Sequence, residues 1–200
     1  EKMVLPPKIP GDFDDIPKTP GNRRTSANLQ LDLSQQKKLI ASYYASVSYV
    51  DAMTGRVLKA LEESGQRDNT IVIFTSDHGY HLGEHDLWSK VSIHEESALV
   101  PLIISVPGKK PAVCRSFVEL LDHYPTVSSL CRLKVPGNLQ GKDISPMFDD
   151  PAVKVREAIL ASGKGRLYRE EEWALLDYGK TGELYDMEND PLETKNVIDS

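Results

Sequence analysis

Four of the chain's five histidines lie within residues 78–94, a window that also holds carboxylates and a lysine. The window follows Asp77, which stands beside His78 at the end of an apolar run that predicts a strand. Ligands of open α/β sheets bind outside the carboxyl ends of strands, so titratable side chains there are candidates for chemistry. Carboxylate oxygens suit calcium or magnesium, and imidazole suits zinc, copper or iron. Gly79 allows the turn that would let both side chains converge on one ion. Two ligands do not complete a site, and the alternative is a loop-capping Asp77 with a packed, polar His78.

Lys90 follows Asp77 by 13 residues. A compact ammonium in a pocket can bind an anionic oxygen or stabilise a leaving group, but a lysine considered alone is most often a solvated surface charge. His81 and His85 are four residues apart and would share a face of a helix. The glycines nearby favour a loop instead, which weakens the prediction of a joint metal site at these two histidines.

The elements that must position this window alternate between helix and strand. Residues 1–31 are rich in proline and predict a loop. A helix is expected from Asp32, a capping residue, to Gly65, because apolar residues recur at spacings of three and four. Two apolar runs predict buried strands of the kind found in a parallel sheet covered by helices, at Thr70–Thr75 and Val100–Val106. A helix over Phe117–Leu130 completes an α/β pattern.

The character of the sequence changes toward the C-terminus. Short strands are expected at Ala158–Ala161, Glu172–Tyr178 and Glu183–Tyr185, and the last two flank a hairpin signal. We therefore predict a domain boundary near residue 150. Residues 1–150 would form part of an α/β domain, and residues 151–200 a small antiparallel β subdomain.

Composition excludes several classes of protein. The net charge is −6 and the pI is near 5.4, so the positive charge that would neutralise nucleic-acid phosphates or an anionic membrane is missing. No apolar run approaches the roughly 20 residues that span a bilayer. Cys114 and Cys131 are too few for a disulfide framework or a four-thiolate zinc site. We expect no nucleic-acid or membrane partner.

Several segments, in order, resemble a type I sulfatase of the alkaline-phosphatase superfamily, with the iduronate-2-sulfatase branch closest. Around the histidine window these segments are Phe74-Thr75-Ser76-Asp77-His78-Gly79, Leu82-Gly83-Glu84-His85 and Trp88-Ser89-Lys90. Elsewhere they are Tyr43–Asp51, Val100–Ile104, Leu121–Thr126, Leu139–Lys142 and Glu183–Asp186. The resemblance covers roughly residues 31–197. It implies an alkaline-phosphatase-like sheet flanked by helices, present in part, followed by the small β-rich subdomain.

The resemblance also implies a chemistry. Family members hydrolyse sulfate esters with a formylglycine made from the Cys or Ser of a C/S-x-P-x-R motif. They hold one calcium ion through an Asp-His or Asp-Asn pair that matches Asp77 and His78, together with other residues and the formylglycine. The family lysine that matches Lys90 contacts the sulfate. Glu84, His85 and Trp88 are candidates for lining the substrate pocket. A sulfated small molecule or glycan, such as a glycosaminoglycan, is the implied substrate.

The chain departs from the family pattern in one respect: neither of its cysteines begins a C-x-P-x-R motif. The nucleophile and the remaining metal ligands are therefore expected in an N-terminal part of the enzyme that this sequence lacks, and the chain alone is expected to be inactive. Family members work mostly in the periplasm, outside cells or in lysosomes. The absence of an N-x-S/T glycosylation site favours a periplasmic or secreted bacterial enzyme over a lysosomal one.

Two alternative functions remain open. One is a phosphodiesterase or phosphatase of the same superfamily, with zinc in place of calcium, because such enzymes share the Ser-Asp-His-Gly sequence. The other is a non-catalytic binding or scaffold fragment.

Overall fold

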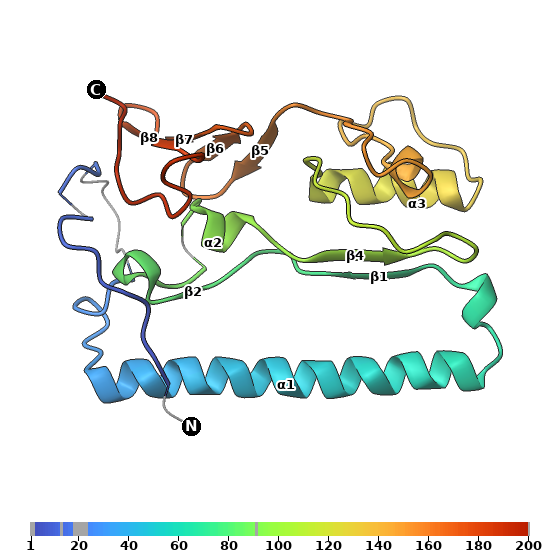
Figure 1. The fold of residues 1–200 in the computed structure, drawn as a ribbon, viewed down its shortest axis with the longest axis horizontal. Coiled ribbons are helices and arrows are strands. Elements are labelled where there is room, and N and C mark those ends of the chain that lie inside the picture. The colour runs from blue at the N-terminus through green and yellow to red at the C-terminus, as the bar shows by residue number, and fades with distance from the viewer. Residues whose placement is uncertain (1–2, 13, 18–23, 91, 200) are drawn as a thin grey trace. The chain divides into compact units, whose positions relative to one another are not determined.

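A computed structural model describes residues 3–12, 14–17, 24–90 and 92–199. The chain forms two compact units, Glu1–Pro107 and Gly108–Ser200 (Figure 1). None of the described helices is long and apolar enough to cross a membrane. The domain boundary predicted near residue 150 stays a prediction.

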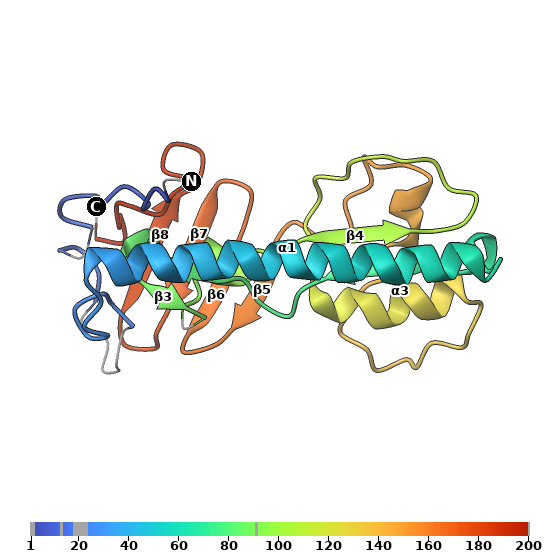
Figure 2. The same ribbon diagram turned by 90° about the horizontal axis from the view of Figure 1, so that it is seen from below.

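The first unit contains the long helix that the apolar spacing predicts. It is α1, Leu33–Glu63, and Figure 2 shows it as one continuous helix. Asp32 is the N-cap: its side chain accepts a hydrogen bond from the Gln35 N–H, and the Gln35 side chain accepts one from the Asp32 N–H. Gly65 follows the helix with a φ of +69°, a left-handed conformation that glycine adopts without strain. Described residues before Asp32 contain no helix or strand, as expected.

The two expected central strands are present, but they pair in the direction opposite to the one predicted. β1 is Val72–Thr75 and β4 is Leu102–Ser105, and they form an antiparallel pair in which Val72 lies opposite Ser105. The expectation of a parallel partner is therefore wrong for these two strands. An apolar run indicates burial but does not specify the direction of the neighbouring strand. Pro101 directly precedes β4, where a missing N–H costs no ladder hydrogen bond.

Between β1 and β4 the chain makes a compact loop region. After η1 (Arg67–Asn69) and β1 come β2 (His81–Leu82), η2 (Glu84–Asp86), β3 (Trp88–Ser89) and α2 (Glu95–Ala98). β2 and β3 form a short antiparallel pair. The core of this loop region consists of Leu87, Trp88 and Ile93, all buried. This small core fixes the residues that follow β1.

The second unit begins with short helices: η3 (Leu120–Asp122), α3 (His123–Leu130) and η4 (Ser145–Phe148). The α-helix thus starts later than the predicted Phe117. The backbone at Glu119 is extended, and Glu119 forms a capping box with Asp122. Both carboxylates accept hydrogen bonds from Arg156. Pro125 lies in the first turn of α3, where no backbone N–H is required, so it does not break the helix.

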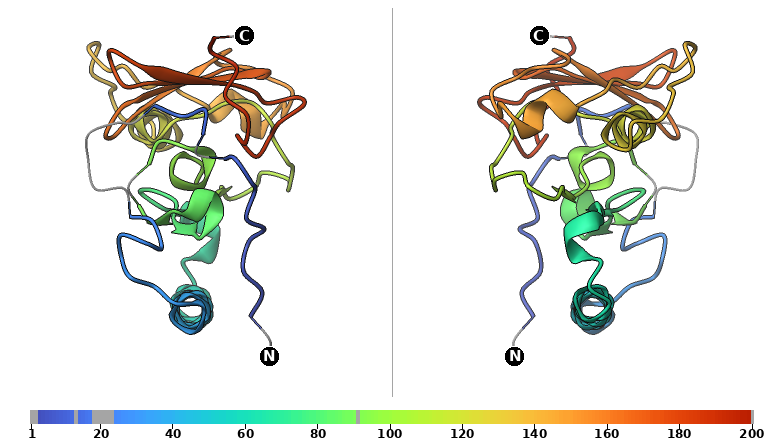
Figure 3. Two further views of the ribbon diagram at one scale, coloured as in Figure 1. Left: turned by 90° about the vertical axis from the view of Figure 1, so that its left-hand side faces the viewer. Right: turned by 90° about the vertical axis from the view of Figure 1, so that its right-hand side faces the viewer.

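The C-terminal subdomain is a four-stranded antiparallel sheet in which each strand pairs with the next along the chain. Figure 3 shows this sheet nearly edge-on, in orange and red. Its strands are β5 (Ile159–Ser162), β6 (Arg166–Arg169), β7 (Trp173–Asp177) and β8 (Gly182–Asp186). The predicted hairpin is β7–β8, which confirms that part of the prediction, whereas β6 was not predicted. Alternate residues of these strands form the core, namely Leu167, Ala174, Leu176 and Tyr185.

Candidate functional site

The pair singled out in the sequence, Asp77 and His78, lies in the loop that follows β1, and Asp77 is two residues beyond the end of the strand. Their side chains face each other: Asp77 Oδ2 and His78 Nε2 are 3.5 Å apart. The Asp77 side chain is 82% exposed and that of His78 is 34% exposed, so both are accessible. They are neither in packed interior nor turned away from each other.

The protonation of His78 follows from its other ring nitrogen. Nδ1 lies 2.8 Å from the carbonyl oxygen of Gly79. A carbonyl oxygen can only accept, so Nδ1 carries the hydrogen, and in the neutral ring Nε2 presents a lone pair. Two acceptors 3.5 Å apart are favourable only when a proton or a cation lies between them. Oxygen ligands of calcium lie at 2.3–2.6 Å, and two ligand atoms at right angles would then be separated by about 3.3–3.7 Å. The separation therefore fits a shared divalent ion and equally fits an ion pair between Asp77 and a protonated His78.

Gly79 anchors this loop to α2. Its N–H donates to the Ser97 carbonyl oxygen at 2.8 Å. A Cβ at position 79 would lie 2.0 Å from the Glu96 carbonyl oxygen, so only glycine permits the approach. The loop is stiffened further because the Ser76 hydroxyl donates to the His78 carbonyl oxygen at 2.8 Å. Hydrogen bonds made by Ser76 and Gly79, the residues that flank the pair, therefore hold the backbone that carries Asp77 and His78.

Lys90 lies just after β3 and is exposed. Ser89, which precedes it, has a φ of +78° and turns the chain at that point. No contact recorded among the described residues joins Lys90 to Asp77 or His78. The structure brings the aspartate and histidine together but does not itself bring the lysine to them.

The three proposed pocket-lining residues have internal partners. The Glu84 carboxylate accepts a hydrogen bond from the Leu82 N–H at 2.6 Å, which closes the turn after β2. Trp88 is 3% exposed and its Nε1–H donates to the Ser26 hydroxyl at 2.9 Å, so its indole belongs to the core of the first unit. His85 Nδ1 lies 3.2 Å from Asp12 Oδ2, and both side chains are nearly buried.

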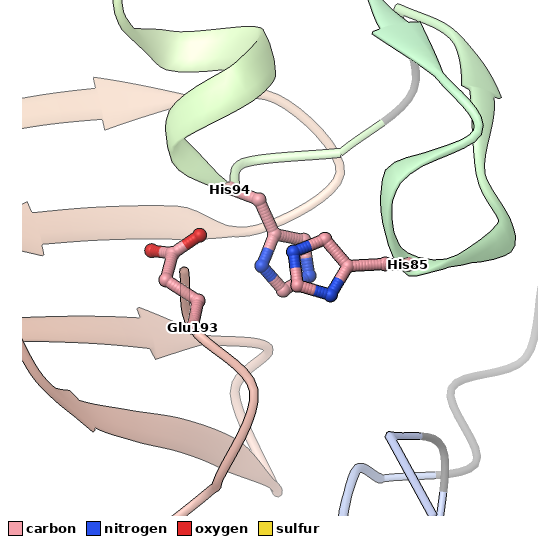
Figure 4. Close-up of side chains that lie close together, drawn as sticks. All are labelled: His85, His94 and Glu193. Atoms are coloured by element: carbon pink, nitrogen blue, oxygen red, sulfur yellow. The ribbon is translucent and has the colours of Figure 1, made fainter. Parts of the chain in front are cut away.

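A cluster of three imidazoles was not anticipated from the sequence. The rings of His85 and His94 stack with centroids 4.7 Å apart (Figure 4), and His81 meets each of them edge-on at 6.2 Å. His81 is fully buried, and its Nε2 lies 2.5 Å from the Ser92 hydroxyl. Burial, reinforced by the other two histidines, lowers the pKa of His81 to about 3. The density of histidines in the window was the available signal. Residues His81 and His85 do not share a helix, since His81 is in β2 and His85 in η2.

Comparison with known proteins shows the family to which the chain belongs. The sulfatase family model matches residues 7–132, and that of the N-sulphoglucosamine sulphohydrolase C-terminal region matches residues 83–200. An arylsulfatase of Clostridium perfringens is 31% identical over 176 residues, which cover 82% of this chain and 37% of that protein. Human iduronate 2-sulfatase is 41% identical over 102 residues, covering 51% of this chain and 18% of the relative. The chain thus spans well under half the length of these relatives.

Similar solved structures support the same family. A 2-O GAG sulfatase has a TM-score of 0.83 and 26% identity, and the match covers all of this chain and 49% of that one. A protein solved in complex with its substrate D-glucosamine-2-N,6-O-disulfate has a TM-score of 0.71 and 31% identity, over 83% of this chain and 37% of that one. A phosphonate monoester hydrolase of Silicibacter pomeroyi has a TM-score of 0.75 and 25% identity, over 82% of this chain and 37% of that one. These neighbours confirm the predicted fold class, alkaline-phosphatase-like with a small C-terminal antiparallel sheet. By sequence and by fold, the chain belongs to the sulfatase family.

Proposed function

We propose that this chain is part of a sulfuric ester hydrolase that acts on a sulfated glycan, and that Asp77 and His78 supply two of its calcium ligands. The observation that carries the proposal is the 3.5 Å approach of Asp77 Oδ2 to His78 Nε2, with Nδ1 engaged by the Gly79 carbonyl. A histidine that binds a metal ordinarily donates its other N–H to such an acceptor, which fixes the ring.

Each residue has a defined task in this proposal. Asp77 contributes an anionic oxygen, and His78 contributes a lone pair from a ring whose proton is held at Nδ1. When bound, the calcium ion offsets the negative charge on the transferring sulfuryl group. The Lys90 ammonium donates hydrogen bonds to a sulfate oxygen and stabilises the leaving oxygen. Calcium suits the carboxylate better than it suits imidazole, so further oxygen ligands are required.

The remaining machinery lies outside these 200 residues in our proposal. In the family that this chain resembles, formylglycine is made within a C-x-P-x-R motif, and neither cysteine of the chain begins such a motif. The partner is therefore the rest of the sulfatase polypeptide, which supplies the formylglycine nucleophile and the other calcium ligands. The chain alone would be inactive. We place the enzyme in the periplasm of a bacterium or outside the cell, in line with the resemblance and with relatives from bacteria.

A glycosaminoglycan-type substrate is supported by what the neighbours' descriptions name, namely a 2-O GAG sulfatase and a glucosamine disulfate complex. A phosphorus ester is the second candidate substrate, since a phosphonate monoester hydrolase has the same fold. The chemistry of sulfuryl and phosphoryl transfer shares the need for cationic stabilisation, so the two must be separated by assay.

The test uses the longer polypeptide. We expect hydrolysis of an aryl sulfate in preference to the matching aryl phosphate, with calcium in the purified enzyme. Asp77→Asn should weaken calcium binding by more than about tenfold, because a residue that merely orients a ligand already contributes that much. Asp68→Asn, at an exposed carboxylate of η1, is the matched control and should change neither quantity. Preference for the phosphate ester together with bound zinc would favour the second candidate.

Lys90→Ala provides an independent test of the sulfate contact. Loss of one contact that stabilises charge in the transition state lowers kcat by roughly 10²–10³-fold. Calcium affinity should be unchanged, since Lys90 is not a ligand. A normal rate in this variant would remove Lys90 from the site.

A further inference from the structure

A short segment before α1 runs along β3, the strand that ends next to the proposed sulfate contact. The Trp88 N–H donates to the Arg24 carbonyl oxygen at 2.9 Å, and Thr25 makes an antiparallel bridge with Leu87. The Ser26 hydroxyl accepts a hydrogen bond from Trp88 Nε1–H at 2.9 Å. Backbone and side-chain contacts of three consecutive residues therefore fix this segment against β3.

The side chain of Arg24 lies beside the residue that precedes Lys90. Its Nη1–H donates to the Ser89 hydroxyl at 3.4 Å, which is long for a hydrogen bond. A guanidinium has five N–H donors, so this one weak contact leaves most of them available. Arg24 and Lys90 are both exposed, and within the part of the chain that the structure describes neither forms an ion pair with a carboxylate.

Two neighbouring cations without acidic partners are unusual in a chain with 30 acidic and 24 basic residues. The two side chains suit different tasks. The Lys90 ammonium is a compact point charge, whereas the planar fork of Arg24 matches the paired oxygens of a sulfate or a carboxylate. Because the backbone of Arg24 is already fixed on β3, less conformational freedom is lost when its side chain binds an anion.

We propose that Arg24 binds a second anionic group of the substrate, a sulfate or a carboxylate, while Lys90 contacts the sulfate that is cleaved. The inference rests on the proposed function, from which Lys90 takes its role. It is in line with the similar protein that was solved in complex with D-glucosamine-2-N,6-O-disulfate, a sugar with two sulfates. Arg24 would thus determine specificity for sugars that carry more than one negative charge.

The test compares three substrates in the longer polypeptide with Arg24→Gln. An aryl sulfate has one anionic group, D-glucosamine-2-N,6-O-disulfate adds a second sulfate, and a 2-sulfated uronate adds a carboxylate. We expect kcat/KM to fall at least about tenfold more for one of the two sugars than for the aryl sulfate, mainly through KM. A hydrogen bond to a charged group contributes this much to binding. The sugar that shows the larger loss identifies the second group.

Arg67→Gln is the matched control. Arg67 is also exposed and also donates to a serine hydroxyl, that of Ser105 at 3.0 Å, but it precedes β1, whereas the candidate site follows that strand. This variant should change none of the three kcat/KM values. Thermal unfolding of both variants shows whether any loss of rate comes from a loss of stability.

Each outcome decides for or against Arg24. Equal losses for all three substrates would place Arg24 at the cleaved sulfate or make it a support for Lys90, and either result overturns the inference. Losses no larger than those of Arg67→Gln overturn it as well. If the wild-type enzyme hydrolyses the aryl sulfate but shows no tenfold contrast, the role of Arg24 alone is refuted.

Calorimetric titration with the two sugars measures Kd without turnover and separates this inference from the proposed function. A wild-type protein that does not hydrolyse the aryl sulfate, yet binds a sugar at least about tenfold more tightly than Arg24→Gln does, refutes the proposed function and leaves the anion contact standing. A wild-type protein that binds neither sugar refutes the anion contact.

Discussion

Adding one methyl group at Gly79 tests whether contact with α2 positions the Asp77–His78 pair. A Cβ there would lie 2.0 Å from the Glu96 carbonyl oxygen and 2.9 Å from the Glu96 carbonyl carbon. Ordinary contacts of this type begin near 3.4 Å. The loop must therefore retreat by about 1.4 Å or the turn of α2 must move by a similar amount, since both obstructing atoms are backbone.

The displacement converts into two measurable quantities. Overpacking of this kind costs about 1–3 kcal/mol, which corresponds to a fall in Tm of about 2–12 °C at the roughly 2–4 °C per kcal/mol of a domain this size. Displacement of a catalytic group by about 1 Å can reduce the rate by about 10²-fold. We expect Gly79→Ala to lower kcat/KM for an aryl sulfate by about that factor and to weaken calcium binding.

Gly141 provides the matched control because it carries the same obstruction in the second unit. A Cβ at Gly141 would lie 2.0 Å from the Leu121 carbonyl oxygen. Gly141→Ala should therefore reduce Tm about as much as Gly79→Ala, without the loss of calcium affinity. The measurements are thermal unfolding, calcium titration and steady-state kinetics of both variants in the longer polypeptide. If Gly79→Ala loses stability but keeps normal calcium affinity and rate, the contact with α2 does not position the pair.

Three further outcomes can be checked by unfolding measurements. Arg156→Met should cost about 3–5 kcal/mol, because it leaves the carboxylates of Glu119 and the fully buried Asp122 without their cation; a denaturant titration showing less than 1 kcal/mol would contradict this. Gly55→Ala should stabilise the protein by about 0.5–1 kcal/mol, since the glycine lies inside α1 and its Cβ would meet nothing within 4 Å; a lower Tm would count against a continuous helix. His81 binds its proton more weakly when folded, so the unfolded state takes up more protons between about pH 3 and 6.5. The stability that neutral His81 contributes is present above pH 6.5 and is lost as pH falls through that window. His81→Gln should flatten this pH dependence, and an unchanged slope would refute the assignment.

The sequence predicted the secondary-structure elements that are determined by interactions between residues close in the chain. The Asp32–Gln35 capping box and the three-and-four spacing specify α1 almost to the residue. The apolar runs locate β1 and β4 but give no information on strand direction, which depends on the chain between them. β6 was missed because it has four residues with an arginine at each end, so its alternation is too short to stand out.

The candidate site likewise contains residues that the sequence indicated and contacts that it did not. From the sequence, Asp77 and His78 could converge only if the chain turned at Gly79, and a loop-capping aspartate was the alternative. In the structure their side chains lie 3.5 Å apart, with the His78 ring oriented by the Gly79 carbonyl. The stack of His85 on His94 lies within the histidine-rich window, but it depends on the path of the loop between the two residues, which their spacing does not specify. The contacts of Arg156 with Glu119 and Asp122 join residues far apart in sequence, so no spacing rule identifies them. Whether Lys90 reaches the pair depends on groups beyond this chain in our proposal.

The order of the strands in the C-terminal sheet bears on how fast it assembles. Because β5, β6, β7 and β8 follow one another as a meander, each pairing closes a loop of only a few residues. Proteins dominated by such short-range pairings acquire their structure rapidly, whereas pairings between distant segments are slow. β1 and β4 are joined by a much longer connection, so their association is the slower event. When the complete chain refolds from the denatured state, the C-terminal sheet should therefore reach its native hydrogen bonding before the central pair does.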